Sequence, residues 1–243
     1  MKKLLYIVFV ILLIGILLIS SIFLYKEYAE KNKQEELFIE IAEEIKKDNT
    51  EEEKNENDID LQKLYEQNND TVGWVKIEDT NIDYPVMQTK DNPNYYLRKN
   101  FYKEYSISGT PYISEQCDIA NSENLIIYGH NIKGNKMFAD LEKYKQKEFY
   151  NDHKIIKFYT LYEFAEYEII AVLKTNVDTG FKYYKYCDLK DQNTFETFIN
   201  KCFELSMYKI SANVNYGDKF ITLSTCEYSQ NNGRLVVVAK KIV

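Results

Sequence analysis

The sequence contains only two histidines among its 243 residues, and its four cysteines are widely spaced. It has no Cys-x-x-Cys pair, no His-Glu-x-x-His motif and no glycine-rich loop of the kind that cradles phosphate. Zinc centres need clustered His and Cys ligands, and a calcium loop needs alternating oxygen ligands around a turn glycine. The acidic run at residues 51–53 has neither feature. We therefore expect no catalytic metal and no bound cofactor.

Proline is also scarce, with three residues, whereas tyrosine is abundant, with 22. This balance favours β-structure over a proline-rich disordered chain. The formal net charge is −7, and an acidic surface argues against nucleic acid or anionic lipid surfaces as binding partners. It is compatible with a partner that carries amines. A composition of 45% hydrophobic and 28% charged residues suits one globular domain with appendages.

One long hydrophobic run lies at residues 4–25 and carries no charge. At about 1.5 Å per residue it can cross the roughly 30 Å hydrocarbon core of a bilayer. Lys2 and Lys3 precede it, so the positive-inside rule places the N-terminus in the cytoplasm and the following domain outside the cell. A cleaved signal peptide is the alternative, but its apolar core is only about 7–15 residues long, and the nearest cleavage candidate, Ser20-Ser21, lies inside the run. We expect residues 1–25 to be a single-pass signal anchor in the cell membrane.

Residues 26–57 are dense in Glu, Lys and Asn and form the predicted linker, which we expect to lift the following domain off the membrane. Leu37, Ile41 and Ile45 recur at helical spacing, which predicts an amphipathic helix. Residues 48–57 contain no apolar side chain and are predicted to be a solvated spacer.

The globular domain is predicted over residues 58–243, and it opens with a short helix at residues 59–68. Beyond this helix, short apolar runs rich in β-branched residues are separated by turn signals. Eight such runs argue for a sandwich or a closed barrel, and we predict a mainly β fold. The predicted strands are residues 73–77, 82–87, 109–113, 124–128, 155–161, 166–174, 219–225 and 234–242.

Two helical segments interrupt these strands. One is predicted over residues 136–144, where Met137 and Leu141 are apolar. A longer helix is predicted over residues 191–208, because its apolar residues recur at i, i+3, i+4 and i+7 and give it one face to pack on the β-body. Cys202 lies on that apolar face, where a buried thiol behaves as a small hydrophobe.

Cys226 follows a predicted strand, and a short polar loop connects it to Arg234, the first residue of the last apolar strand. A thiol and a guanidinium therefore lie at the facing ends of two strands. A nearby cation favours the thiolate form of a cysteine, because it lowers the thiol pKa. A buried structural cysteine beside a surface arginine is the alternative. Cys117 and Cys187 lie in polar stretches and could be free or paired.

His130 also follows an apolar strand, and Gly129 before it permits a close approach of the backbone. A cysteine nucleophile needs an imidazole to take and return a proton, a role worth roughly 10²–10⁴ in rate. The other histidine, His153, lies in a polar turn and is predicted to be solvated. His130 is therefore the candidate partner of Cys226.

Thr-Leu-Ser-Thr-Cys at residues 222–226, Arg234 at the head of a Val-rich strand and Tyr-Gly-His-Asn at residues 128–131 resemble the sortases, specifically class B. The resemblance covers roughly residue 58 to the C-terminus. It implies an eight-stranded β-barrel with N-terminal helices and a long helix between strands six and seven. Further similar segments are residues 72–77, 82–86 and 137–141.

The resemblance implies a cysteine transpeptidase of the Gram-positive cell surface. Cys226 would attack a peptide carbonyl and form a thioester, and His130 would be the general base and acid. Arg234 would bind the substrate backbone or the oxyanion, because its guanidinium presents several donors. The peptide would be the C-terminal sorting signal of an exported protein, cut after Thr. The acceptor would be an amine of the peptidoglycan peptide.

The resemblance also implies a peptide-binding groove. Asn94 is an alternative to Asn92, because the spacing from Asn92 to Leu97 is one residue longer than the family pattern. The tyrosines that precede the long helix could equally serve ordinary loop packing. The predicted substrate-binding residues are Ser224, Glu227, Asn92, Leu97, Tyr183 and Tyr184.

Two other functions would fit a Cys and a His on an exported β-domain. A papain-like wall hydrolase has a cysteine that starts a helix and precedes its histidine, whereas here His130 precedes Cys226, which ends a strand. A surface adhesin that merely retains a β-body would tolerate the loss of Cys226. The chain order and the strand context favour the transpeptidase.

Overall fold

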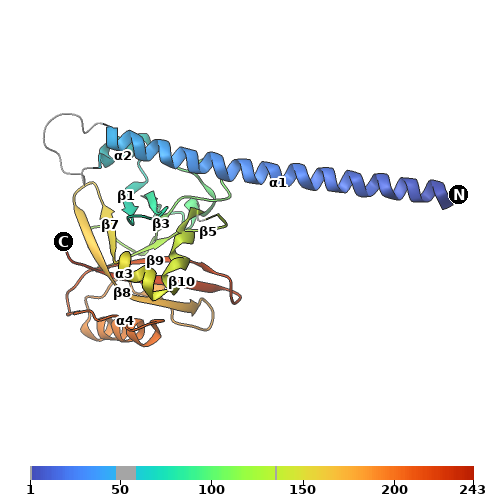
Figure 1. Ribbon diagram of the computed structural model, residues 1–243. Coiled ribbons are helices and arrows are strands. Elements are labelled where there is room, and N and C mark those ends of the chain that lie inside the picture. Colours follow the sequence, from blue (N-terminus) through green and yellow to red (C-terminus); the bar gives the residue numbers. More distant parts are fainter. Residues whose placement is uncertain (1, 48–58, 135) are drawn as a thin grey trace.

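A computed structural model describes residues 2–47, 59–134 and 136–243 (Figure 1). Within these residues, eight strands close into a barrel in the order β1-β2-β3-β4-β9-β10-β8-β7. This architecture confirms the predicted mainly β barrel, whereas the predicted spacer at residues 48–57 lies outside the described residues. The barrel strands are β1 (Thr71–Lys76), β2 (Asp83–Met87), β3 (Tyr112–Ile113), β4 (Asn124–Tyr128), β7 (Ile155–Tyr159), β8 (Phe164–Asn176), β9 (Phe220–Glu227) and β10 (Gly233–Lys241).

The third strand is much shorter than the predicted run of residues 109–113. Gly109 has a φ of 62°, in the left-handed region that favours glycine, and Thr110 donates its backbone N–H to Tyr96 O (3.0 Å). Tyr96 belongs to the 3₁₀ helix η1 (Tyr95–Arg98). The start of the predicted strand therefore bonds to this helix, and β3 begins only at Tyr112.

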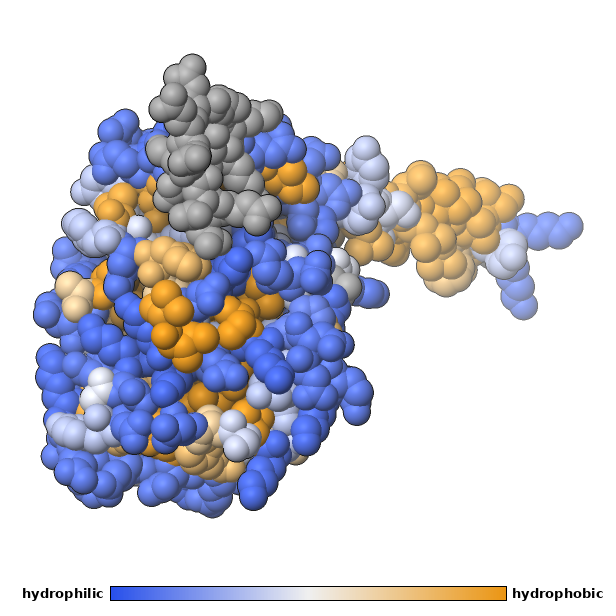
Figure 2. All heavy atoms as spheres, turned by 60° about the vertical axis from the view of Figure 1, so that its left-hand side comes forward, coloured by the Kyte–Doolittle hydropathy of each residue, from blue (hydrophilic) through white to orange (hydrophobic). Residues whose placement is uncertain are grey.

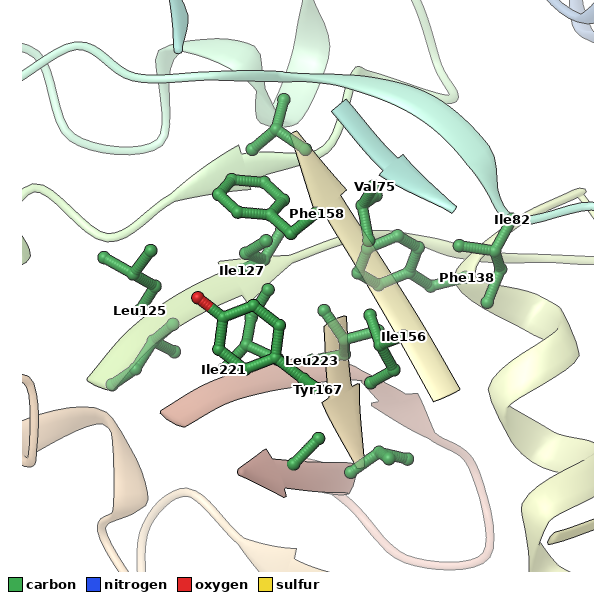
Figure 3. Packing of buried hydrophobic residues seen from close by; sticks show 14 of the residues in the cluster. Val75, Ile82, Leu125, Ile127, Phe138, Ile156, Phe158, Tyr167, Ile221 and Leu223 are labelled. Carbon is green, nitrogen blue, oxygen red and sulfur yellow. The ribbon is translucent and has the colours of Figure 1, made fainter. Parts of the chain in front are cut away.

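Apolar side chains from several strands fill the barrel interior (Figure 3). Val75, Ile127, Phe158 and Leu223 are each at most 1% exposed. Burying such a side chain stabilises the fold by about 1.5–3 kcal/mol relative to leaving it in water. The β-branched and aromatic composition of the strands thus becomes a closed hydrophobic core.

The segment after His130 differs from the predicted helix over residues 136–144. A short hairpin comes first, formed by β5 (Asn131–Ile132) and β6 (Lys136–Met137), and the 3₁₀ helix η2 (Phe138–Lys145) and then α3 (Lys147–Asp152) follow it. The helical prediction was wrong at its start, because Met137 pairs with Asn131 across the hairpin.

The longer predicted helix is present as α4 (Gln192–Leu205). Asp191 caps it by accepting the backbone N–H of Thr194 (2.8 Å). The helix lies between the sixth and seventh barrel strands in chain order, β8 and β9, and packs its apolar face on the barrel. Its buried Cys202 belongs to that face.

The N-terminal helix α1 (Lys2–Lys47) is one continuous element with two different surroundings. Its first part is exposed and apolar, long enough to cross a membrane, and projects from a domain whose visible face is largely hydrophilic (Figure 2). Its second part is packed: Phe38 meets the ring of Tyr84 edge-on at 5.2 Å, and Ile41 and Ile45 are buried. The predicted amphipathic helix is therefore part of the core.

A second helix, α2 (Leu61–Gln67), packs its buried Leu61 and Leu64 beside α1 and β1, close to the predicted position. Elsewhere, Cys117 and Cys187, 70 residues apart in sequence, form a disulfide with Cα atoms 5.3 Å apart. This disulfide resolves the alternative that the sequence leaves open for these two cysteines. Cys202 and Cys226 are free.

Replacing Cys117 and Cys187 together by Ser should lower the free energy of unfolding by about 2–5 kcal/mol, because the disulfide closes a long loop. The measurement is thermal or denaturant unfolding of the purified protein. Cys202→Ala, which removes a free thiol without opening a crosslink, is the matched control and should cost less. Equal stability of the double variant and the unchanged protein would contradict a structural role for the disulfide.

Candidate active site

Cys226 and Arg234 line one surface groove of about 380 Å³ together with His130, which is distant from them in sequence. The groove lies at the end of the barrel where β4 and β9 finish and β10 begins. The sequence predicted these three residues as a group, and the strand pairing explains how they meet.

Cys226 and Arg234 face each other across two antiparallel strands. They are direct register partners in the β9–β10 pair, next to Gly233, which pairs with Glu227. A register pair places two side chains on the same face of a sheet, about 4.5–5.5 Å apart at their Cβ atoms. Arg234 also donates from Nη1 to Gly233 O (2.8 Å), and Cys226 is half-buried. A fixed cation therefore lies beside an accessible thiol.

His130 comes to the other edge of the same strand. β4 runs parallel to β9, with Tyr128 paired to Ser224. The ladder continues past the strand end, because Gly129 N–H donates to Ser224 O (3.0 Å) and Thr225 Oγ1 donates to Gly129 O (2.7 Å). These bonds fix the backbone of His130 beside β9, the strand that carries Cys226.

The residue after His130 ties the loop to Cys226 itself. Asn131 Nδ2 donates to the backbone oxygen of Cys226 (2.9 Å), and Phe138 N–H donates to His130 O (2.8 Å). Below the loop, a Cβ placed on Gly129 would lie 2.4–2.8 Å from ring atoms of Phe138, a distance that real Cβ atoms essentially never show. Glycine is therefore required at position 129 if the loop is to lie this close to η2.

The imidazole of His130 has a defined orientation. Its Nε2 lies 2.9 Å from Leu97 O. A carbonyl oxygen can only accept, so Nε2 carries the proton and the neutral ring keeps Nδ1 free as a base. Burial lowers the pKa of His130 most; the hydrogen bond to Leu97 opposes this effect, and the charge of Arg98 adds to it. The net result is a pKa below the ordinary value, which favours the neutral base.

Four of the six predicted substrate-binding residues line the groove: Ser224, Leu97, Tyr183 and Tyr184. Tyr183, in the 3₁₀ helix η3 (Tyr183–Lys185), is 1% exposed, and its hydroxyl lies 2.6 Å from Ser224 Oγ. Tyr183 therefore holds the side chain of Ser224 in the groove wall. Tyr184 is half-buried beside it.

Asn92 does not line the groove, whereas Asn94 does. Asn94 has a left-handed φ of 61°, and its Oδ1 accepts a hydrogen bond from Tyr112 (2.8 Å). Asn92 is exposed, and its backbone oxygen accepts from Thr89 (2.8 Å). Of the two asparagines that the sequence leaves open, the structure brings Asn94 to the site.

Glu227 does not line the groove either, although it follows Cys226 directly. It is 3% exposed, and it forms ion pairs with Lys145 (2.7 Å) and Lys174 (3.3 Å) and accepts a hydrogen bond from Ser229 Oγ (2.6 Å). Burial raises its pKa, but hydrogen bonds from Lys145, Ser229 and Lys174 outweigh burial and lower the pKa to about 2. The geometry makes Glu227 a structural carboxylate that joins β9 to η2 and β8.

The sequence analysis missed several residues of the groove. Tyr112 and Tyr128 pack their rings together at a centroid distance of 5.4 Å and form part of its wall. Their place at paired positions of β3 and β4 is a signal that depends on the strand pairing, which the sequence alone did not supply. Further lining residues are Ser114, Glu115, Gln116, Val177 and Thr225.

His153 lies away from the groove, as the end cap of α3. Its ring stacks on Phe149 with centroids 3.9 Å apart, and its Nδ1 lies 2.9 Å from Phe149 O. His153 is therefore packed on a helix end and not simply solvated. Among the described residues, no group of three or more His, Cys, Asp or Glu side chains is arranged to hold a metal ion.

Replacing Gly129 by Ala should destabilise the protein by about 1–3 kcal/mol, because the added methyl overpacks against Phe138. Denaturant unfolding measures the loss. Phe138→Leu in the Gly129→Ala background is the matched control, since a smaller side chain should recover part of the stability as a coupling energy. Simple additivity of the two changes would show that the close approach does not constrain the loop.

The pKa of His130 should be below 6.5, the ordinary value for histidine, and Arg98→Gln should move it upward, because the change removes a cation that lowers it. NMR titration of the imidazole signals in a Cys226→Ala background measures both values without coupling to a thiolate. With two histidines in the chain, His153→Gln assigns the spectrum. A pKa above 6.5, or a downward shift in Arg98→Gln, would contradict the assigned environment.

Comparison with known proteins agrees with the geometry. A family model for the sortase domain matches residues 75–242. Sortase B of Listeria monocytogenes serovar 1/2a is 38% identical over 190 residues, which cover 75% of this chain and 73% of that protein. Sortase B of Staphylococcus aureus is 35% identical over 178 residues, covering 72% of this chain and 71% of that protein.

Solved structures give the same result. Sortase B from Bacillus anthracis matches with a TM-score of 0.75 at 33% identity, covering 90% of this chain and 99% of that chain. A Staphylococcus aureus sortase B–substrate complex matches with a TM-score of 0.69 at 34% identity, covering 75% of this chain and 84% of that chain. A sortase B complexed with triglycine matches with a TM-score of 0.68 at 34% identity, covering 75% of this chain and 85% of that chain. The chain therefore belongs to the sortase family, and the relatives described here are sortase B proteins.

Proposed function

We propose that this protein is a membrane-anchored transpeptidase that cleaves a C-terminal sorting signal after Thr and joins the exported protein to an amine of the cell wall. Membership of the sortase family makes the chain a cysteine transpeptidase that serves cell-wall anchoring. One observation carries the assignment of its residues: Cys226 lies between Arg234 on one neighbouring strand and the His130 loop on the other.

In the first half of the reaction, the sulfur of Cys226 attacks the carbonyl carbon of the scissile bond. The carbonyl oxygen becomes an oxyanion, and the guanidinium of Arg234 stabilises it or holds the adjacent peptide backbone. His130 takes the thiol proton at Nδ1 and gives it to the leaving amine as the carbon–nitrogen bond breaks. The products are a thioester on Cys226 and a free amino group on the departing peptide.

In the second half, an acceptor amine attacks the thioester carbon. His130 removes a proton from the incoming amine and returns it to the sulfur of Cys226, so an amide forms and the thiol is regenerated. The matched sortase B complexed with triglycine supports a glycine amine as the type of acceptor. No metal or cofactor is needed to balance either half-reaction.

The groove around the three residues suits an extended peptide. Leu97 offers an apolar contact, Asn94 and Ser224 offer polar ones, and Tyr183 fixes Ser224 by the contact at 2.6 Å. The matched complex of Staphylococcus aureus sortase B with a substrate supports a peptide ligand for this groove. We assign Glu227 a supporting role, since its carboxylate is occupied by Lys145 and Lys174.

The location follows from α1. Its apolar, exposed first part is the proposed single-pass anchor, and Lys2 and Lys3 at its start support a cytoplasmic N-terminus. The catalytic domain would then lie on the extracellular side. This position suits a reaction on exported proteins and on wall peptides.

Cys226→Ala should abolish cleavage of a sorting-signal peptide, because no other group in the groove can form the thioester. His130→Ala should stop turnover as well, since the leaving amine then lacks a proton donor. Arg234→Lys keeps the charge but loses the planar fork of donors, and should lower kcat/KM by about 10²-fold or more. Peptide cleavage by the three purified variants measures these effects.

Circular dichroism of each variant provides the control for folding, and Lys201→Gln, on the exposed face of α4, provides a matched loss of a cation outside the groove. Near-normal cleavage by Arg234→Lys would show that Arg234 contributes only its positive charge and not the planar arrangement of its donors. Cleavage by a folded Cys226→Ala variant would overturn the proposed mechanism.

A further inference from the structure

The docked part of α1 touches the domain in a definite order. Near its C-terminal end, Glu44 pairs with Lys63 of α2 (3.1 Å), and one to two turns earlier Phe38 packs on Tyr84 of β2. Earlier still along the helix, and so closer to the exposed apolar part, two loops of the domain bind α1. From its C-terminal end toward its N-terminus, α1 therefore contacts first α2, then β2 and then these two loops.

The first of these loops is the β5–β6 hairpin, which directly follows His130. Lys136 on this hairpin donates from Nζ to Asn32 Oδ1 (2.7 Å) and to Lys31 O (3.3 Å), and lies 3.7 Å from Glu35. The catalytic histidine loop is thus fastened to the part of α1 that lies nearest the apolar stretch.

The second loop follows the groove wall that contains Leu97. Ile107 donates its backbone N–H to Glu30 Oε1 (2.9 Å), and Arg98 donates to Ile107 O (2.8 Å). Both walls of the groove are therefore attached to α1 at residues 30–35. In Figure 1 the β9–β10 hairpin and β5 lie on the side of the barrel from which α1 extends toward its N-terminus.

The distance from this attachment to the apolar stretch is short. The uncharged run ends at Tyr25, five residues before Glu30. At 1.5 Å per residue this is roughly 7–8 Å along the helix axis. Tyr25 and Tyr28 are 72% and 65% exposed, and tyrosine is the residue type that gathers at the membrane–water interface.

We propose that α1 acts as a rigid strut that holds the catalytic end of the barrel toward the lipid headgroups of the membrane it spans. The proposal rests on the proposed membrane anchoring. The surface that faces the lipid is the rim formed by the β5–β6 hairpin and the loop that contains Ile107. The docking of α1 sets the orientation, so the acidic domain needs no attraction to the lipid.

Such an orientation has a functional consequence. A peptide tethered to the same membrane meets the groove at a raised effective concentration, whereas a peptide free in solution gains nothing from it. The strut therefore favours substrates that are still attached to the membrane. This preference depends on the anchored full chain, and the groove alone would not produce it.

Fluorescence energy transfer in vesicles tests the orientation. The full chain with Cys226→Ala is labelled with a donor at Lys133→Cys, an exposed position on the β5–β6 turn, and the vesicles contain headgroup-labelled acceptor lipids. Tyr162→Cys, 88% exposed in the turn between β7 and β8, is the matched control at the other end of the barrel. The remaining cysteines are disulfide-bonded or buried and should not take the label.

Energy transfer to the lipid acceptors should be efficient from position 133 and weak from position 162. The two positions lie at opposite ends of the barrel, and β8 alone spans up to about 40 Å between these ends. Equal transfer from both positions, or the reverse order, would overturn the proposal. This measurement does not depend on catalysis.

A second experiment tests the preference for tethered substrates. Seven Gly/Ser residues inserted after Tyr28 should uncouple the domain from the anchor, and seven helix-forming residues inserted at the same point are the matched control. In the otherwise unchanged enzyme, the flexible insertion should lower cleavage of a lipid-attached peptide about tenfold relative to the helical insertion. Cleavage of the same peptide free in solution should be equal in both.

If the variants with the flexible and the helical insertion cleave the lipid-attached peptide at equal rates, α1 has no effect on substrate choice and the proposal fails. If neither peptide is cleaved by the unmodified chain, the proposed function fails instead. The transfer measurement still decides the orientation in that case, so the two failures are distinguishable.

Discussion

The site depends on one structural constraint, the position of β9 between a parallel and an antiparallel neighbour. β4 pairs with β9 in parallel over five positions, and β10 pairs with it in antiparallel register. Parallel pairing brings the C-terminal ends of β4 and β9 to the same end of the barrel, and antiparallel pairing brings the start of β10 there too. The side chains of Cys226 and Arg234, from one hairpin, thus meet His130, about 100 residues earlier in the chain, without any need for a flexible loop to fold over them.

Electrostatics behind β9 reinforce this constraint. A buried carboxylate is costly unless charged or polar groups compensate it, and Glu227 receives contacts from Lys145 at the end of η2 and from Lys174 of β8. Removing both lysines would leave the buried charge with Ser229 alone, which is costlier than the loss of a surface ion pair. The cluster therefore fixes the position of the residue next to Cys226 relative to two other elements.

Much of this architecture was readable from the sequence. The strands follow from apolar, β-branched runs, and Cys226, His130 and Arg234 stand out because each lies at the end of such a run. Glu227 does not line the groove for a simple physical reason: successive side chains of a strand point to opposite faces, so the carboxylate that follows Cys226 is turned toward Lys145 and Lys174. The family resemblance indicates that Glu227 lies next to Cys226 in the chain, whereas strand alternation determines the side to which its side chain points.

Other features could not be read from local pattern. The choice between Asn92 and Asn94 depends on a left-handed residue in an irregular turn, and the Cys117–Cys187 pairing depends on chain segments that meet only in the fold. The spacing of Leu37, Ile41 and Ile45 predicted a helix with one apolar face, but periodicity does not name the surface that covers that face. Here the surface is formed by β2 of the barrel and by α2.

The docking of α1 gives the His130 loop a second attachment. On one side, the His130 loop is bonded to β9 through Ser224 and Thr225; on the other, the hairpin that follows it is bonded to α1 through Lys136. A loop held from both sides has few alternative positions to lose when a ligand binds, so little free energy is spent on ordering the imidazole. The contacts of Lys136 also connect the His130 loop to the helix proposed to span the membrane. The Lys136 contacts therefore contribute both to the proposed preorganisation of His130 and to the proposed orientation of the domain.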